Sequence, residues 1–190
     1  VHVEPAGDGH RVRYAIADVA FWVDRGSALE REAWRRGVTY YAPDRREPLY
    51  PPVLSQGAAS LLPDGTRPAV LFDLLLDGRG ALASWSVGRA LVRSRAQLTY
   101  AQFLAHATRP DASPLAGEPW AETLVLLAEV GARRRALEVA RGGVSLPVRD
   151  QHVQRRAAEA LGYVLTYETP SDAEGWNAQI SLLAGHAAAT

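Results

Sequence analysis

The stretch that decides the fold reads AVLFDLLLDGRGALASWSVGRALVR and occupies residues 69–93. Two runs rich in apolar residues, 69–76 and 81–93, flank the tetrapeptide Asp-Gly-Arg-Gly at 77–80. Aspartate and glycine between two such runs are typical of a β-hairpin turn, because both residue types adopt the backbone conformations that tight turns require. We therefore predict a β-hairpin here.

Upstream of the hairpin, residues 1–4 and 10–23 predict two more strands around the turn Ala-Gly-Asp-Gly at 6–9. Ser27 and Glu30 form a capping box, which predicts a short helix that reaches Arg36 and ends at Gly37. Residues 38–68 contain six prolines and little periodicity, and we expect an ordered but irregular segment there.

Downstream of the hairpin, helix signals dominate. Capping boxes at 99–102 and 171–174 each predict the start of a helix, and a third helix is expected from Pro119 to about Ala140. Residues 108–117 are the expected linker. Residues 144–148 and 163–167 are candidate strands, and a helix is one option between them.

The fold class predicted from this order of elements is α+β, with a mixed or antiparallel sheet packed against helices. The strand-rich half is residues 1–98 and the helix-rich half is residues 99–190. We expect both halves to belong to one domain.

Composition excludes several classes of function. The 190 residues are 47% hydrophobic and contain no cysteine, so the chain has no disulfide framework, no thiolate zinc site and no cysteine nucleophile. The 21 basic residues, all arginine, balance 21 acidic residues, so the overall charge does not favour a nucleic-acid partner. The chain shows no signal peptide and no apolar run of membrane-spanning length, and we expect a cytoplasmic protein.

The two ends predict that this polypeptide is part of a longer protein. The chain begins at Val1, it contains no methionine, and an apolar helical stripe continues to the last residue, Thr190, without a stop signal.

Few residues are arranged for catalysis or metal binding. There is no G-x-S-x-G motif and no cluster of carboxylates of the kind that binds magnesium. His2 and His10 could face each other across the first predicted hairpin and bind a metal, although such pairs are more often solvated cross-strand contacts. Asp18 is the one acid inside an apolar strand, where a carboxylate needs a partner. It either bonds to backbone amides or an arginine, or forms one wall of an ion or RNA site.

Residues 36–67 combine exposed-loop features that suit single-stranded nucleic acid. Rigid proline-rich loops that carry aromatic rings and guanidinium groups can stack on any base and pair with any phosphate. Proline- and tyrosine-rich loops of this kind more often have only a structural role, in which they cover the core of the protein. The residues are Tyr40, Tyr41 and Tyr50, Pro43, Pro48, Pro51, Pro52 and Pro63, and Arg36, Arg45, Arg46 and Arg67.

A series of motifs, in this order, resembles the RNB catalytic domain of ribonuclease II-type exoribonucleases, and the chain looks like a fragment of that domain. The motifs are Ile16-Ala17-Asp18-Val19, Arg36-Gly37, Tyr41-Ala42-Pro43, Pro48-Leu49-Tyr50-Pro51, Leu54-Ser55, Ser60-Leu61, Arg67-Pro68, the segment from Val92 to Tyr100, and the segment from Trp176 to Leu183.

The resemblance implies processive 3′→5′ hydrolysis of single-stranded RNA to nucleoside monophosphates with Mg²⁺. It implies that Tyr41 clamps the terminal nucleotide and that Pro43, Ser55 and Arg67 help to shape the RNA channel. The family's metal-binding aspartates would precede Val1, and its catalytic arginine would follow Thr190, so no catalytic residue and no metal ligand is expected in this chain. We expect the protein to be a monomer. Its expected partner is single-stranded RNA, and we expect no association with a membrane.

Two other interpretations stay open. Ala178 and Gln179 replace the Glu-Glu pair common in the family's last helix, and a non-catalytic RNB-like module could bind RNA or a protein partner without cleavage. A purely structural domain is the third interpretation, and a Tyr41 side chain buried in the core would support it.

Overall fold

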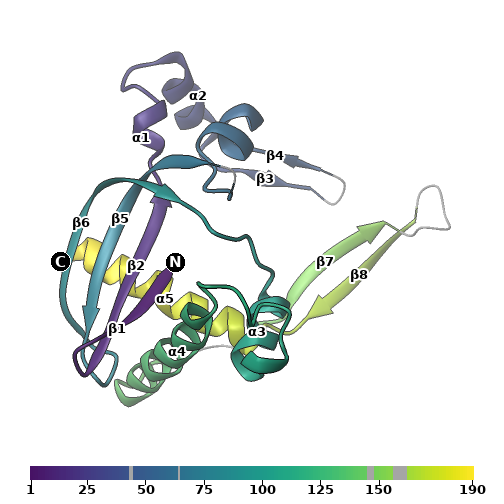
Figure 1. Ribbon diagram of the computed structural model, residues 1–190. Coiled ribbons are helices and arrows are strands. Elements are labelled where there is room, and N and C mark those ends of the chain that lie inside the picture. The colour runs from purple at the N-terminus through teal and green to yellow at the C-terminus, as the bar shows by residue number, and fades with distance from the viewer. Residues whose placement is uncertain (43–44, 64, 145–147, 156–161) are drawn as a thin grey trace.

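The computed structural model describes residues 1–42, 45–63, 65–144, 148–155 and 162–190. Figure 1 shows an antiparallel sheet with helices beside it, a smaller group of elements above it, and a hairpin that projects to one side. In chain order the elements are β1 (His2–Ala6), β2 (Gly9–Ala17), α1 (Val19–Trp22), α2 (Ala28–Arg36), β3 (Tyr40–Tyr41), β4 (Arg46–Glu47), the π-helix η1 (Val53–Ala58), β5 (Thr66–Leu76), β6 (Leu82–Arg93), α3 (Tyr100–Thr108), the 3₁₀ turn η2 (Pro110–Ala112), α4 (Glu122–Ala140), β7 (Asp150–Arg155), β8 (Tyr163–Glu168) and α5 (Asp172–Ala189).

The main sheet has the strand order β1-β2-β5-β6, and each neighbouring pair is antiparallel. The predicted hairpin is confirmed as β5 and β6. Its turn is closed by the Asp77 side chain, which accepts hydrogen bonds from the backbone N–H groups of Arg79 and Ala81, both at 2.9 Å. The α+β class, with an antiparallel sheet packed against helices, is confirmed.

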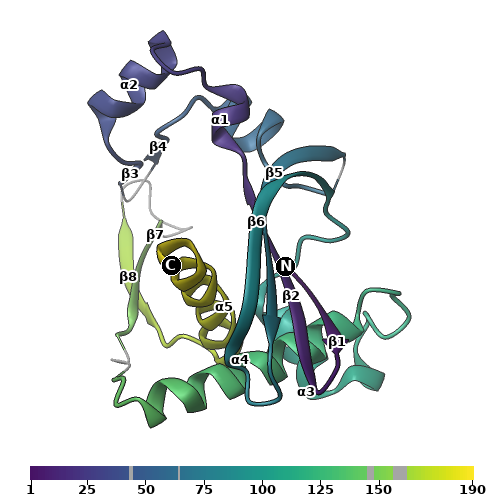
Figure 2. The ribbon, with the colours of Figure 1, turned by 90° about the vertical axis from the view of Figure 1, so that its left-hand side faces the viewer.

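The core lies between one face of this sheet and the helices α4 and α5. Alternate residues of β2 and β5 point to that face, as strand geometry requires. Figure 2 shows α5 along the sheet and α4 running beneath it. The buried side chains of the core are those of Val3, Val12, Phe72, Leu74, Leu76, Phe103, Leu124, Leu127, Val130, Ala173, Ile180, Leu183, Ala184 and Ala187.

Two contacts of α4 fix the sheet and the last helix in place. Gly131 faces Trp176 so closely that a Cβ atom at this position would lie 2.7 Å from the Cα atom of Trp176. Arg133 and Arg134 donate hydrogen bonds to the carbonyls of Gly78 and Gly80 in the β5–β6 turn, at 2.7 and 3.2 Å. Burial of the Arg134 guanidinium lowers its pKa from the ordinary value.

The helix starts predicted from the three capping boxes are confirmed, and the helix expected from Pro119 begins at Glu122. Thr99 with Gln102 and Ser171 with Glu174 form complete capping boxes. The Ser27 hydroxyl accepts a hydrogen bond from the N–H of Glu30, and the helix ends at Gly37, whose φ of +74° favours glycine.

One strand prediction is wrong in part. The strand expected over 10–23 ends at Ala17, and Val19–Trp22 is one helical turn. The register of β2 with β5 ends at the pair Ala17↔Ala69, beside Pro68, which has no backbone N–H to donate to a strand partner. The strand expected over 144–148 falls mainly on residues 145–147, outside the described residues. The strand that pairs with β8, the confirmed second strand, is Asp150–Arg155. The helix considered between the two expected strands is therefore wrong over 150–155, and residues 156–161 lie outside the described residues. Within the described residues, no helix has the length and apolarity needed to cross a membrane.

Candidate nucleic-acid interface

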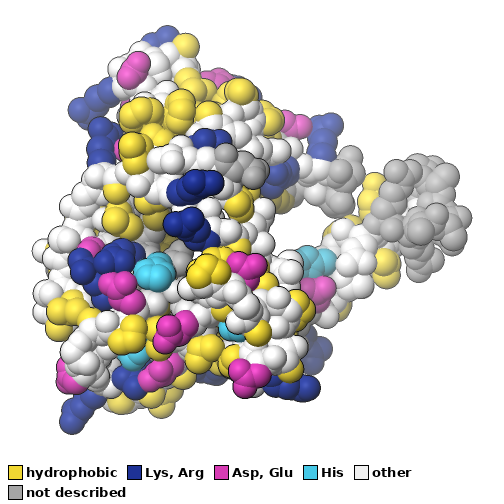
Figure 3. Space-filling view, in the orientation of Figure 1, with side chains coloured by type: hydrophobic (Ala, Val, Ile, Leu, Met, Phe, Trp, Pro, Cys, Tyr) yellow, Lys and Arg dark blue, Asp and Glu magenta, His cyan; other side chains and the backbone are white. Residues whose placement is uncertain are grey.

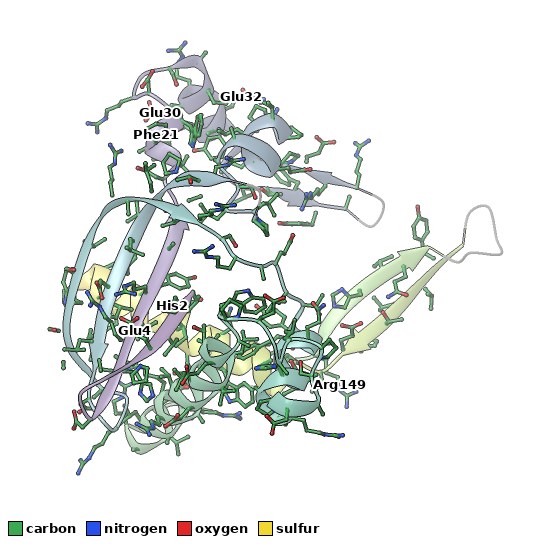
Figure 4. All side chains as sticks on the ribbon, viewed as in Figure 1. His2, Glu4, Phe21, Glu30, Glu32 and Arg149 are labelled. Atoms are coloured by element: carbon green, nitrogen blue, oxygen red, sulfur yellow. The ribbon has the colours of Figure 1, made fainter. Side chains whose placement is uncertain are left out.

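The elements between β2 and β5 form a separate upper lobe, which comprises α1, α2, β3, β4 and η1 (Figure 1). The lobe begins and ends on neighbouring strands, and the backbone N–H of Asp18 donates to the carbonyl of Pro68 at 3.3 Å. Phe21, Glu30 and Glu32 are labelled on this lobe in Figure 4, whereas His2 and Glu4 lie on β1 of the sheet below. Most of the proline-rich segment 36–67, which the sequence suggested as a surface for single-stranded nucleic acid, is thus part of the upper lobe.

Tyr41 lies on the two-residue strand β3, opposite Arg46 of β4. Its side chain is 79% exposed, so it takes no part in the core. The purely structural interpretation therefore lacks the support that a buried Tyr41 would have given it. An exposed tyrosine ring on a short paired strand offers a flat face on which a base can stack.

Hydrogen bonds tie the segment around Tyr41 to helix α2 and its exit. The Arg36 guanidinium donates to the carbonyl of Pro48 at 3.1 Å, and the Thr39 hydroxyl accepts from the N–H of Leu49 at 3.1 Å. The N–H of Ala42 donates to the carbonyl of Arg45 at 2.8 Å. These bonds hold Tyr41 on a braced segment rather than on a free loop.

The other predicted RNA-binding residues lie on different elements. Ser55 is exposed on η1, and its hydroxyl donates to the carbonyls of Tyr50 and Pro51, both at 3.2 Å. Arg67 lies at the start of β5, and its Nε is buried without a hydrogen-bond partner among the described residues. Pro43 lies outside the described residues. The RNA-binding roles of these residues, and of Tyr41, stay predictions.

Asp18 pairs with an arginine. Its side chain is only 3% exposed, and Oδ2 lies 2.9 Å from Nε of Arg89 on β6. The interpretation of Asp18 as an acid bonded to an arginine is confirmed. The pair links the start of the upper lobe to the edge strand of the sheet, because Arg89 lies two strands away from β2.

A cavity of about 560 Å³ lies at the sheet, near the N-terminal residues Val1 and His2. Arg13, Arg93 and Arg95 contribute to its lining. Sequence reasoning missed this group, since residues 13 and 93 come together only through strand pairing. Figure 3 shows arginine side chains, in dark blue, gathered at a hollow below the upper lobe on one face of the molecule.

No group of three histidine or acidic side chains that could hold a metal ion occurs among the described residues. The proposed pairing of His2 with His10 is wrong, because in the β1–β2 register His2 lies opposite Arg13 and His10 opposite Pro5. The His2 ring lies 2.9 Å from the Thr123 hydroxyl, and His10 is buried beside Glu129.

Comparison with known proteins decides the family. The family model described as "RNB domain" matches residues 1–190, the whole of this sequence. The chain belongs to the RNB family. Ribonuclease R of Aquifex aeolicus is 36% identical over 106 residues, which are 55% of the RNB chain and 15% of that enzyme. The RNB chain therefore spans only a small part of the curated relatives that it matches.

Solved structures confirm the RNB fold. Mycoplasma genitalium RNase R, in complex with ribose-methylated single-stranded RNA, superposes with a TM-score of 0.85 and 22% identity, and covers 94% of this chain and 28% of its own. Yeast Ssd1, described as a pseudonuclease, superposes with a TM-score of 0.58 and 19% identity over 73% of this chain and 16% of its own.

Proposed function

We propose that this RNB chain is part of a 3′→5′ exoribonuclease that hydrolyses single-stranded RNA to nucleoside monophosphates. The observation that carries the proposal is the match to the RNB family over all 190 residues, with relatives named Ribonuclease R. In this proposal, residues 1–190 form part of a single catalytic domain, and the longer protein is a cytoplasmic monomer.

Tyr41 is the proposed clamp for the terminal nucleotide. Its exposed ring, held by the braced segment, would stack on a base and keep the scissile phosphate in register. Arg67 is proposed to pair with a backbone phosphate, because a planar guanidinium can donate two parallel hydrogen bonds to phosphate oxygens. Ser55 and Pro43 are proposed to shape the channel wall near Tyr41.

Magnesium is the proposed cofactor of the longer protein, and its chemistry would be activation of the attacking water. The described residues of this chain do not fit such a site, because they contain no cluster of three suitable ligands. We therefore assign the magnesium ligands to parts of the longer protein other than residues 1–190, and assign the RNA-holding residues to this chain.

The proposal is tested with the full-length protein and a single-stranded RNA labelled at its 5′ end. A ladder that shortens progressively from the 3′ end is expected with magnesium, and removal of the metal with EDTA should abolish it. A blunt duplex of the same sequence, which offers no single-stranded 3′ end, should be shortened more slowly. Shortening of a 3′-labelled strand from its 5′ end would contradict the proposal.

A second candidate is a non-catalytic RNB-like module that binds RNA or a protein partner. The structural similarity to Ssd1 favours it, since that protein is described as a pseudonuclease. Ala178 and Gln179, which replace the acidic pair common in the family, point the same way. The same assay separates the two candidates, because a non-catalytic module would leave the labelled RNA at its full length.

A further inference from the structure

The cavity near Val1 has a floor formed by the sheet face that points away from the core. Ala15 and Leu71 lie opposite each other on β2 and β5, and both alternate with residues that point to the core. Val92 continues this floor on β6, and Leu98 and Trp120, which also pack against the core, contribute further apolar lining. The volume of about 560 Å³ lies in the range of about 300–1,000 Å³ that is usual for small-ligand sites.

The charge around this cavity is positive. No acidic residue contributes to the lining formed by the described residues, whereas three arginines and one histidine do. Arg13 already pairs with Glu4, at 2.9 Å between Nη2 and Oε1. Arg93 and Arg95 are exposed, and neither has an ion pair or a side-chain hydrogen bond within the part of the chain described. Among the described residues, their guanidinium groups therefore have no side-chain partner that a ligand would have to displace.

The predicted RNA-binding residue Arg67 belongs to the same region. It pairs in register with Val92, which contributes to the cavity floor, and Thr66 pairs with Arg93. Three arginines therefore occupy the upper end of the β5–β6 hairpin and the residues that follow it. An apolar floor beside guanidinium groups that make no ion pair with any described residue suits a ligand with an apolar ring and an anionic group.

We infer that this cavity is a nucleotide subsite for RNA, in which Arg93 and Arg95 bind backbone phosphates and the apolar wall at Leu98 and Trp120 receives the attached nucleoside. The inference rests on the proposed function and adds a second point of contact, since Tyr41 does not line the cavity. Arginine suits this role because its fork of N–H donors matches the oxygens of a phosphate.

The test uses the full-length protein in magnesium-free buffer and a fluorescent single-stranded oligoadenylate. Arg93→Ala and Arg95→Ala should each raise the Kd by about tenfold, as expected for the loss of a hydrogen bond between charged groups. The slope of log K against log salt should become shallower by about 0.7 for each arginine, because each neutralised phosphate of a single strand releases part of a counterion.

The matched control is Arg79→Ala, which removes an exposed arginine from the opposite end of the same hairpin. Its Kd and salt slope should equal those of the unmodified protein. Thermal unfolding should be unchanged in all three variants, because none of these side chains makes a hydrogen bond in the described structure.

The nucleoside part of the inference is tested with an oligonucleotide that carries abasic sites. The unmodified protein should bind the abasic strand more weakly than the intact strand. This loss of affinity should be smaller in the protein that lacks both Arg93 and Arg95. An equal loss in the two proteins would overturn the assignment of a nucleoside to this cavity.

Failure of the inference differs from failure of the proposed function. If Arg93→Ala and Arg95→Ala behave like Arg79→Ala while the unmodified protein binds RNA, the subsite is wrong and the proposed function stands. If the unmodified protein does not bind RNA at all, both fail. A structure of the full-length protein in which other parts of the chain fill the cavity would also overturn the subsite.

Discussion

Tyr41 projects from a strand of only two residues, yet 79% of its side chain faces solvent. An exposed aromatic ring contributes little to the free energy of folding, because it removes little apolar surface from water. The adjacent Tyr40 is also exposed, at 61%, and alternation along the strand points it to the other side. The two tyrosines therefore allow a test of RNA contact that is separate from stability.

Replacement of Tyr41 by alanine in the full-length protein should lengthen the final, undegraded RNA product without abolishing cleavage. Loss of the stack removes about 1–3 kcal/mol of affinity for the terminal base, so short products dissociate earlier. Product lengths are measured on a sequencing gel with 5′-labelled RNA. Tyr40→Ala is the control and should leave product lengths unchanged. Equal product lengths in Tyr41→Ala and the unmodified protein would refute the clamp.

At the same scale, Asp18 shows what a sequence can say about a single residue. A carboxylate inside an apolar run requires a partner, and this requirement alone predicted an arginine or backbone amides. The identity of the partner, Arg89, could not be predicted, because it lies 71 positions away and reaches Asp18 only through the pairing of β2, β5 and β6.

At the scale of elements, the crossing of α4 and α5 depends on one glycine. In Gly131→Ala the added methyl group meets the side chain and backbone of Trp176, and such overpacking costs about 1–3 kcal/mol. The gain in helix propensity of about 1 kcal/mol offsets part of this cost, so the net destabilisation should be up to about 2 kcal/mol. The measurement is chemical denaturation followed by circular dichroism.

Gly185→Ala is the matched control within helix α5. Nothing lies within 4 Å of the added atom, so only the propensity gain remains and the free energy of unfolding should rise by about 0.5–1 kcal/mol. Destabilisation of the same size in both variants would show that the α4–α5 contact is looser than described.

Elements with local signals were predictable from the sequence. The capping boxes at Thr99 and Ser171 depend on residues three apart, and the β5–β6 hairpin depends on its own turn. The errors occurred where a distant partner decides the structure. The apolar residues at 19–22 continue a strand pattern, yet the pairing with β5 stops at Ala17, beside Pro68, and the chain turns into α1.

At the scale of the whole molecule, the net charge of zero conceals local pairing that makes stability depend on pH. Hydrogen bonds from Arg35, and next from Arg36, lower the pKa of Glu32 from 4.5 to about 2. A hydrogen bond from Arg11 lowers the pKa of Asp73, and bonds from the backbone and hydroxyl of Ser171 lower that of Glu174.

Each of these carboxylates binds its proton more weakly in the folded than in the unfolded chain. Their stabilising contribution is complete above the unfolded pKa, and for Glu32 it is lost as the pH falls from 4.5 towards about 2. The free energy of unfolding should therefore be lower at about pH 3 than at about pH 5. Chemical denaturation at both values measures the difference, and Glu32→Gln should reduce it. If Glu32→Gln leaves the difference in the free energy of unfolding between the two pH values unchanged, Glu32 is not a source of the pH dependence.

The candidate site was predictable only in part for the same reason. Tyr41 and Arg67 were found from motifs that are continuous in the sequence. The cavity was not, because Arg13, Leu71 and Arg93 come from three strands and its lining emerges only when the sheet forms.

The attachment of the upper lobe has a further consequence. The segment leaves the sheet after Ala17 and returns at Thr66, and Ala17 pairs directly with Ala69 on the neighbouring strand. Two adjacent strand ends of this kind can be joined by a short connection, because loop closure there has little entropic cost. The segment that carries Tyr41 is in this sense an insertion into a hairpin. We therefore expect changes in the length or sequence of this segment to leave the sheet and its core in place.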